Sequence, residues 1–432
     1  MPPVHSTGET SPLIPQDRDN SQCHDSGPDE RQTTFSFRVG AAMYSFAVLG
    51  LFTSSIGVML QPISHYYSLS DLHVSLIFLV GPVGYVLAAQ SNEFIHSKFG
   101  QRGIAIVGPI FHLASSILLA VHLPFYAVLV AFSIAALGTG LLDGSFCAWA
   151  GSMDNANTIS GLLHGSFSVG ASIGPFLAGT IMSAAKRPWY DWYFVLFGAS
   201  VIECAILVYA FRYEDAQRYH KHAELGASNA NPKLFLRYRA TWFSAAYFLA
   251  YVGTETAVSG WVVSFMARAR HTTPYLASLS SSGFWAGMAI GRLSLGAITD
   301  RLGVRRATAI YFVCVISFAV LFAATPVPIA DIIFVTFMGF FMGPLFPSGV
   351  VVLAGLLPKD LHIAAVSFVA SIGQIGGALL PFGIGAIIDG LGIKTFQYAI
   401  VVSSAATLGL WLAFAQLRPK AITADLDETD ED

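Results

Sequence analysis

The chain has 432 residues, of which 54% are hydrophobic and only 11% are charged, whereas soluble domains have about 45–50% and about 25%. A soluble fold of this length does not cover so much apolar surface with so few charges, which excludes a soluble enzyme, a nucleic-acid-binding protein and a disordered scaffold. Four scattered cysteines indicate neither a disulfide framework nor a metal site. The composition therefore predicts an integral membrane protein, and we expect no metal and no cofactor.

Residues 1–36 are rich in polar residues and lack the apolar segment of a signal peptide, so we expect a disordered cytoplasmic tail. The apolar segments that follow are long enough to cross a bilayer, which takes about 20 residues. They are continuously apolar rather than alternating, which predicts helices and excludes a β-barrel. We predict an all-α fold with twelve transmembrane helices at 39–60, 74–90, 103–121, 125–151, 158–185, 192–211, 241–267, 276–298, 307–324, 332–357, 363–388 and 396–417.

The longest internal polar stretch divides these spans into two sets of six. Residues 212–239 are predicted to form a cytoplasmic linker between an N-terminal bundle (37–211) and a C-terminal bundle (240–417), and residues 418–432 an acidic tail. Most of the 23 Lys and Arg residues fall in the tails and in the loops on one side. Because positive loops stay in the cytoplasm, both termini are expected there, in a plasma or vacuolar membrane protein.

The two halves also resemble each other. A short loop with Gly100 follows the second span, and a similar loop with Gly303 follows the eighth. A glycine-rich segment ending at Pro175 in the fifth span returns at Pro381 in the eleventh, at nearly the same spacing. Two motifs repeated at nearly one offset predict two pseudo-symmetric six-helix bundles.

At these loops the chain resembles the major facilitator superfamily, whose pattern Gly-x-x-x-Asp-Arg-x-Gly-x-Arg-Arg matches residues 296–306. The first half has Ser97 where the pattern has an aspartate, which implies a weaker latch there. The resemblance implies that the loops latch helix ends and gate the transporter without contacting substrate. The expected gating residues are Lys98, Gly100, Arg102, Asp300, Arg301, Gly303, Arg305 and Arg306.

A narrower resemblance is to the fucose permease-like branch and its fungal relatives, through residues 251–261, 163–175 and 343–347. In that branch an acid in the fourth helix is associated with proton coupling, and Asp143 occupies a similar position. The branch's acid in the first helix is absent, since residues 50–57 contain none. The resemblance thus implies sugar-like transport without identifying fucose as the substrate.

Ionisable residues inside a membrane span are costly and mark functional sites. Glu255 lies near the middle of the seventh span, where transporters bind substrate, and Tyr251 and Trp261 offer rings for stacking. Asp143 and His164 lie at similar depths in the fourth and fifth spans. Because burial disfavours the charged form of both, they are candidates for a proton relay.

Two further candidates contact the substrate in this hypothesis. Gln374 in the eleventh span is suited to bind a hydroxyl group, and Trp285 in the eighth span offers a second ring. Arg292 is expected to be structural, paired with Asp300 or snorkelling to the membrane surface. Glu203 and His112, on helices expected at the periphery, are assigned to local hydrogen bonds or lipid-edge polarity.

The sequence thus predicts a monomeric secondary transporter of a small polar solute, with sugar favoured and proton coupling expected. Export of a metabolite or drug by proton antiport is an alternative, because the Gly-x-x-x-Gly-Pro segment in the fifth span also resembles the antiporter motif of drug exporters. A receptor or sensor on a transporter scaffold is an alternative from another class. No nucleotide-binding loop or catalytic cluster is visible, which argues against a pump and an enzyme.

Overall fold

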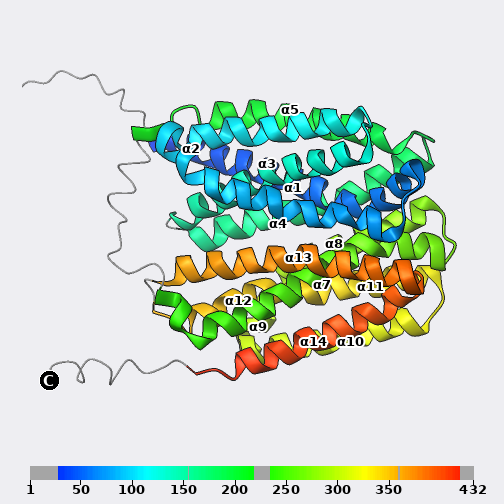
Figure 1. The fold of residues 1–432 in the computed structure, drawn as a ribbon. Coiled ribbons are helices and arrows are strands. Elements are labelled where there is room, and N and C mark those ends of the chain that lie inside the picture. Colours follow the sequence, from blue (N-terminus) through cyan, green and yellow to red (C-terminus); the bar gives the residue numbers. More distant parts are fainter. Residues whose placement is uncertain (1–27, 154, 218–233, 359–360, 419–432) are drawn as a thin grey trace, which may run out of the picture.

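The computed structural model describes residues 28–153, 155–217, 234–358 and 361–418. Within these ranges the chain forms helices and no strands, arranged as two bundles that lie one above the other in Figure 1. We call the end at which α1 begins and α14 ends the tail end, and the opposite end the far end.

The first half contains five long helices. They are α1 Pro28–Tyr67, α2 Asp71–Ala120, α3 Phe125–Gly151, α4 Ala156–Ser183 and α5 Trp192–Ala210, with a short 3₁₀ helix (η1, Trp189–Asp191) before α5. The second half begins with a 3₁₀ turn (η2, Leu234–Arg237). Its helices are α7 Arg239–Ala269, α8 Pro274–Ser294, α9 Gly296–Leu302, α10 Val304–Ala324, α11 Pro328–Met342, α12 Leu345–Ala354, α13 His362–Leu391 and α14 Thr395–Ala415.

The predicted count of twelve spans agrees with these helices once three details are considered. Nine helical segments of the described chain are long and apolar enough to cross a membrane, and α11 and α12 together form one of them. Helix α2 contains two spans, because Gly100 breaks it with a positive φ of 68° that glycine tolerates. Helices α7 and α8 are long enough to cross, and they carry the polar residues Glu255 and Arg292 that lower their hydropathy.

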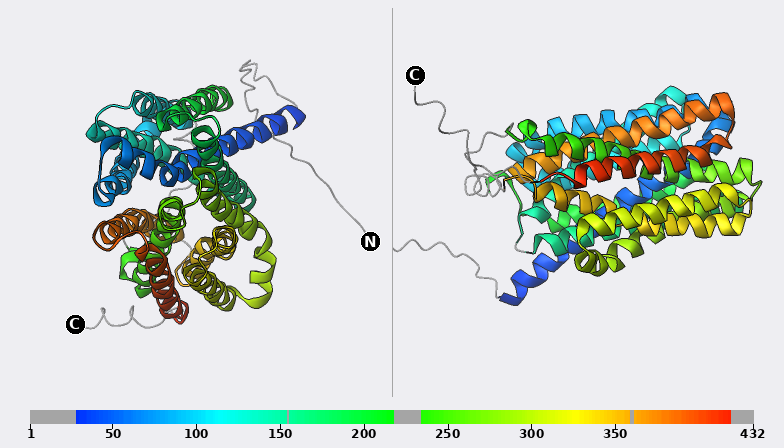
Figure 2. Two further views of the ribbon diagram at one scale, coloured as in Figure 1. Left: turned by 90° about the vertical axis from the view of Figure 1, so that its right-hand side faces the viewer. Right: turned by 90° about the horizontal axis from the view of Figure 1, so that it is seen from below.

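Several predicted boundaries are wrong, because hydropathy reports the bilayer and not the ends of a helix. Helix α1 begins at Pro28, inside the predicted disordered tail, and its first turns extend beyond the bundle (Figure 2). Helix α7 begins at Arg239, the last residue of the predicted linker. The predicted span 332–357 is two helices, α11 and α12, separated at Gly343 and Pro344. Positions 1–27, 218–233 and 419–432, to which we assigned tails and linker, lie outside the described residues.

Matched glycines join equivalent helices in the two halves. A Cβ on Gly170 of α4 would lie 1.9 Å from the carbonyl oxygen of Ala47 in α1, and a Cβ on Gly376 of α13 would lie 1.9 Å from that of Leu249 in α7. Only a hydrogen at these positions permits such backbone contact. The repeated glycine motif therefore serves helix packing within each bundle.

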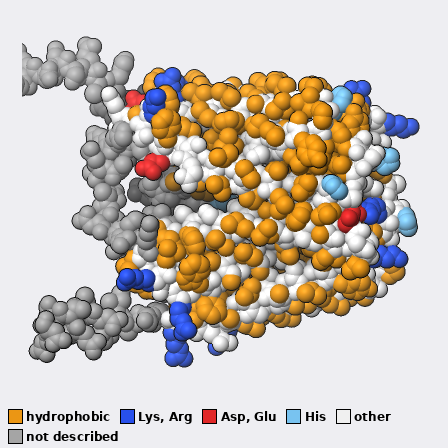
Figure 3. Space-filling model, in the orientation of Figure 1, with side chains coloured by type: hydrophobic (Ala, Val, Ile, Leu, Met, Phe, Trp, Pro, Cys, Tyr) orange, Lys and Arg blue, Asp and Glu red, His pale blue; other side chains and the backbone are white. Residues whose placement is uncertain are grey.

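The two bundles meet in the far half of the molecule and separate toward the tail end. At the far end the carboxylate of Asp71 in α2 pairs with Arg268 in α7 at 2.6 Å, and Asp389 in α13 accepts the backbone N–H of Leu72 at 3.3 Å. A pocket of about 350 Å³, lined by these charged side chains and Trp261, remains beside the pair. Figure 3 shows the surface hollowed between the halves at the tail end. The interface is thus closed at the far end and open at the tail end.

Candidate functional site

Glu255 lies where α1 and α7 separate toward the tail end. One turn farther along α7 the two backbones touch, since a Cβ on Gly57 of α1 would lie 2.3 Å from the carbonyl oxygen of Ser259. Residues four apart share a helix face, so Glu255 lies on the face of α7 that meets α1, and it is half-buried. Its carboxylate is within electrostatic range of the Arg292 guanidinium on α8 and lies near Tyr251, whose hydroxyl donates to the carbonyl oxygen of Met342. A carboxylate therefore stands at the point where the interface opens.

Arg292 extends from α8 across the interface to the other bundle. Its Nη1 donates to the Oγ of Ser168 in α4 at 2.8 Å, and its Nε donates to the carbonyl oxygen of Gly343 at 3.4 Å. It also acts electrostatically on Glu255 and His164. The expected pairing with Asp300 or the membrane surface is wrong, because position along one helix does not reveal which neighbouring helix a long side chain can reach.

Asp143 and His164 are connected through a thiol that sequence analysis did not consider. The Sγ of Cys147, one turn after Asp143 on α3, lies 3.6 Å from the Asp143 carboxylate and 3.8 Å from the Nε2 of His164 on α4. His164 is exposed, and its carbonyl oxygen accepts a hydrogen bond from Ser168 at 3.0 Å. Cys147 follows Asp143 by four positions, and Ser168 follows His164 by four. Because residues four apart share a helix face, this spacing is the signal that the sequence offers for both.

A polar path therefore crosses the molecule at the level where the bundles separate. It runs from Asp143 and Cys147 through His164 and Ser168 in the first half to Arg292 in the second half, and Glu255 interacts with its last member. Figure 1 shows α3 and α4 in the upper bundle and α7 and α8 in the lower one. We call these six residues the interface path.

The three aromatic candidates are packed side chains in this structure. The Tyr251 hydroxyl donates to the carbonyl oxygen of Met342 at 3.0 Å, and the Trp261 indole donates to that of Pro381 at 2.8 Å. Trp285 is 3% exposed, and its ring packs edge-on against Phe167. Stacking on a substrate requires a free ring face, so this expectation is not met in the present conformation. The polar atoms of Tyr251 and Trp261 tie neighbouring helices instead, whereas the buried indole N–H of Trp285 has no hydrogen-bond partner among the described residues.

Gln374 lies on a polar face of α13. It is exposed, as are Ser367 and Ser371, which precede it at spacings that place all three on one side of the helix. The opposite side of the helix packs against α7 through Gly376. A polar face is expected to line the opening between the bundles rather than contact lipid.

The two predicted gating loops contact neighbouring helix ends at the tail end. The backbone N–H of Arg102 donates to the carbonyl oxygen of Glu214, just after α5, and Arg305 donates to the carbonyl oxygen of Leu417, just after α14. Gly303 has a φ of 80°, like its counterpart Gly100. The Lys98 ammonium group lies over the rings of Phe94 and Phe99. Asp300 and Arg301 lie at the end of α9, before Gly303, and Arg306 lies at the beginning of α10. Each loop contacts helices of its own bundle.

His112 and Glu203 form a buried pair inside the first bundle. The imidazole Nδ1 lies 2.8 Å from one carboxylate oxygen, and the other oxygen accepts a hydrogen bond from Ser45 at 2.6 Å. Thr139 contacts the remaining ring nitrogen at 3.2 Å. Both members of the pair are 0% exposed, so the expectation of lipid-edge polarity is wrong and that of local hydrogen bonds holds. A helix at the periphery still turns one face inward.

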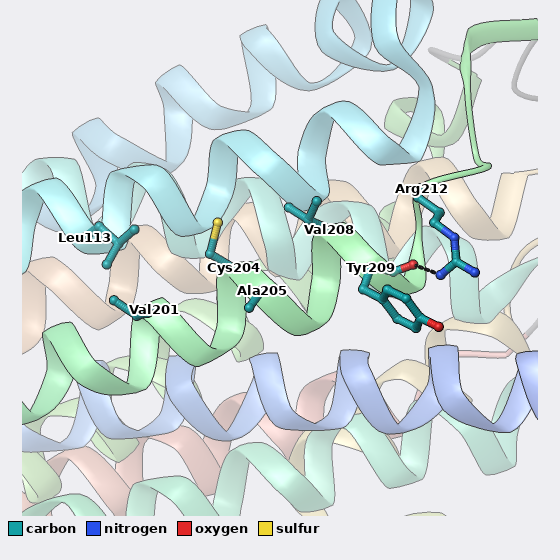
Figure 4. Close-up of a pocket in the computed structure, with 7 residues that line it drawn as sticks. All are labelled: Leu113, Val201, Cys204, Ala205, Val208, Tyr209 and Arg212. Carbon is teal, nitrogen blue, oxygen red and sulfur yellow. Dashed lines mark hydrogen bonds between the residues drawn. The ribbon is translucent and has the colours of Figure 1, made fainter.

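A pocket lies on the outer surface of the first bundle, between α2 and α5 (Figure 4). Its volume is about 540 Å³, and its lining is apolar except near Arg212, whose guanidinium lies 4.0 Å from the centre of the Tyr209 ring. Such a surface suits lipid chains better than a polar solute. Among the described residues, no group of acidic, histidine or cysteine side chains is arranged to hold a metal.

Comparisons with known proteins agree with this architecture. The sequence model of the Major Facilitator Superfamily matches residues 42–265 and 243–430. "Bypass of stop codon protein 6" of Saccharomyces cerevisiae is 27% identical over 389 residues, which cover 83% of this chain and 78% of that protein. "Glucose/mannose transporter GlcP" of Bacillus subtilis is 22% identical over 375 residues, covering 83% and 91%.

A solved structure shares the fold. The crystal structure of a D323A mutant of the nucleoside transporter NupG superimposes with a TM-score of 0.70 at 10% identity, covering 88% of this chain and 98% of that one. The family model covers nearly all of both bundles, and family membership identifies a multi-pass membrane transporter rather than an enzyme. The chain belongs to the Major Facilitator Superfamily.

Proposed function

We propose that the chain is a secondary transporter that carries a small polar solute by alternating access, with protons as the coupling ion. The interface path carries this proposal, because two acids, an arginine and a histidine meet where the bundles separate. Ionisable groups at this depth are otherwise costly. The name of GlcP, a glucose/mannose transporter, supports a sugar-like solute.

The direction of opening follows from the proposed topology. With both termini in the cytoplasm, the open tail end faces inward and the pair of Asp71 and Arg268 closes the outside. In this state the path is reached from the cytoplasm. Rocking of the bundles would break the far-end pair and close the tail end around Glu255.

Two acids are the candidate proton carriers. Asp143 and Glu255 are half-buried and lie on opposite halves of the interface. A proton on either carboxyl group would change the charge that faces the opposite bundle and so bias which end opens. Gln374 and the two serines beside it are the proposed hydroxyl-binding face.

Reconstituted protein tests the proposal. Vesicles should accumulate a sugar or a related solute faster with an inward proton gradient than without one. Glu255→Gln and Asp143→Asn should abolish this acceleration, because neither amide titrates. Equal rates with and without the gradient would contradict proton coupling. Full acceleration in both variants would contradict the assignment of these two acids.

A further inference from the structure

Arg292 differs from three other arginines of the described chain that contact a neighbouring helix or loop. The guanidinium groups of Arg38, Arg268 and Arg270 each lie 2.6 Å from a carboxylate oxygen. Among the described residues no carboxylate oxygen lies within 4.0 Å of Arg292. Its two hydrogen-bond acceptors, Ser168 and the carbonyl of Gly343, are both neutral. Arg292 is thus a cation in the middle of the interface without a contacting counter-ion.

An arginine inside a membrane protein is expensive unless it is paired. A guanidinium has five N–H donors in a planar fork, and the hydrogen bonds to Gly343 and Ser168 use one donor on Nε and one on Nη1. The donors that remain match the two oxygens of a carboxylate, which a guanidinium binds in a bidentate manner. Because Arg292 is only half-buried, a ligand that enters the tail-end opening can approach it.

We propose that Arg292 is a specificity-determining residue that binds a single carboxylate group on the transported solute. This inference rests on the proposed function, because it assigns the substrate class of the same interface site. The solute would be a hydroxylated monocarboxylate: its acid group contacts Arg292, and its hydroxyl groups face the polar side of α13 at Gln374.

The charges around Arg292 limit the solute to one negative charge. Glu255 approaches from α7 and His164 from α4, and both interact electrostatically with the guanidinium. Asp143 on α3 is the next acid along the interface path. One arginine among two acids cannot offset a dianion. A protonated Glu255 would remove the nearest competing negative charge, so one proton is expected to accompany each anion.

Ligand pairs that differ in one functional group provide the test. Binding to the purified full-length protein is measured calorimetrically for gluconate against sorbitol, glucuronate against glucose, and glycerate against glycerol. A bidentate ionic contact replaced by a neutral group changes the affinity by about tenfold to about a hundredfold. We expect at least one acid to bind more tightly than its neutral partner by this factor.

Variants locate the effect. Arg292→Gln should erase the preference for the acid, and Arg292→Lys should retain part of it, because lysine keeps the charge without the fork. Arg187→Gln is the matched control: it removes an exposed cation whose Nε already lies 2.5 Å from the carboxylate of Asp191, and it should leave the preference unchanged. Elution as a single monodisperse species verifies that each variant is folded.

Three results would overturn the inference: tighter binding of the neutral members, an acid preference that survives in Arg292→Gln, or binding of no acid in the set. The proposed transport function is judged separately by proton-driven uptake. A neutral solute that moves with protons would overturn the role of Arg292 and leave that function standing.

Discussion

The two bundles share one fold but have different interiors. The first bundle buries the polar network of Ser45, His112, Thr139 and Glu203, whose four side chains come from four different spans. At the centre of the second bundle, rings cluster around Tyr247 at centroid distances of 5.1–6.2 Å. They are Phe248, Tyr251, Phe312, Trp411 and Phe414.

This difference shows that a duplicated backbone does not require duplicated core chemistry. In the aromatic cluster of the second bundle the hydroxyls of Tyr247 and Tyr251 each bond to one backbone carbonyl. In the first bundle one carboxylate joins two helices directly and a third through the imidazole. Failure of one member should therefore matter more in this network than in the aromatic cluster around Tyr247.

The largest effect is expected from His112→Leu. The change leaves the Glu203 carboxylate buried without its partner, and breaking a buried pair in this way lowers the free energy of unfolding by about 3–5 kcal/mol. Thermal unfolding in detergent, followed by loss of the monodisperse peak, measures it. The double variant with Glu203→Leu should recover much of the loss, because an apolar pair needs no counter-charge. If His112→Leu alone is as stable as the parent protein, the proposed difference between the two bundles is wrong.

The next prediction tests the glycine contacts that the two bundles have in common. Gly170→Ala and Gly376→Ala each place a methyl group 1.9 Å from a backbone oxygen, and such overpacking costs about 1–3 kcal/mol or more. Both should lower the unfolding temperature by similar amounts. Gly198→Ala and Gly409→Ala are matched controls in open positions, where alanine favours the helix and should be neutral or stabilising. Very different losses at the two test sites would contradict the equivalence of these contacts.

A smaller effect is expected from Tyr247→Phe. The ring and its aromatic neighbours remain, and only the 2.9 Å hydrogen bond to the carbonyl of Leu345 is lost. Net hydrogen bonds of this kind contribute about 0.5–1.5 kcal/mol. The same unfolding assay should rank this variant well above His112→Leu in stability. A loss as large as that of His112→Leu would show that the aromatic core also depends on single polar contacts.

The smallest effect on stability is expected from Cys147→Ala. The thiol is half-buried at the interface and makes only weak hydrogen bonds, so the unfolding free energy should change by no more than about 0.5 kcal/mol. The pH profile of uptake should nevertheless shift, because the link between Asp143 and His164 is removed. Cys204→Ala, in the outer pocket, is the control and should change neither quantity. A stability loss without a shifted profile would assign the thiol to packing.

Sequence reasoning reached the candidate residues unevenly. Depth along a helix is simple arithmetic, so Asp143 and His164 were correctly expected at one level, and Cys147 now links them. The sequence of one helix does not reveal which neighbouring helix a side chain reaches. For that reason Arg292 was assigned to the wrong partners, and the inward side of Glu203 was missed.

By itself the sequence determined the membrane class, the twelve spans and the repeat, because hydropathy and motif spacing are local properties that survive without knowledge of neighbours. The tertiary structure decided which end of the interface is closed, that Arg292 donates its hydrogen bonds to neutral acceptors, and which rings are packed away from the opening. These depend on how helices far apart in the chain are brought into contact. Pairing across a bundle is a property of the packed helices and not of any one segment.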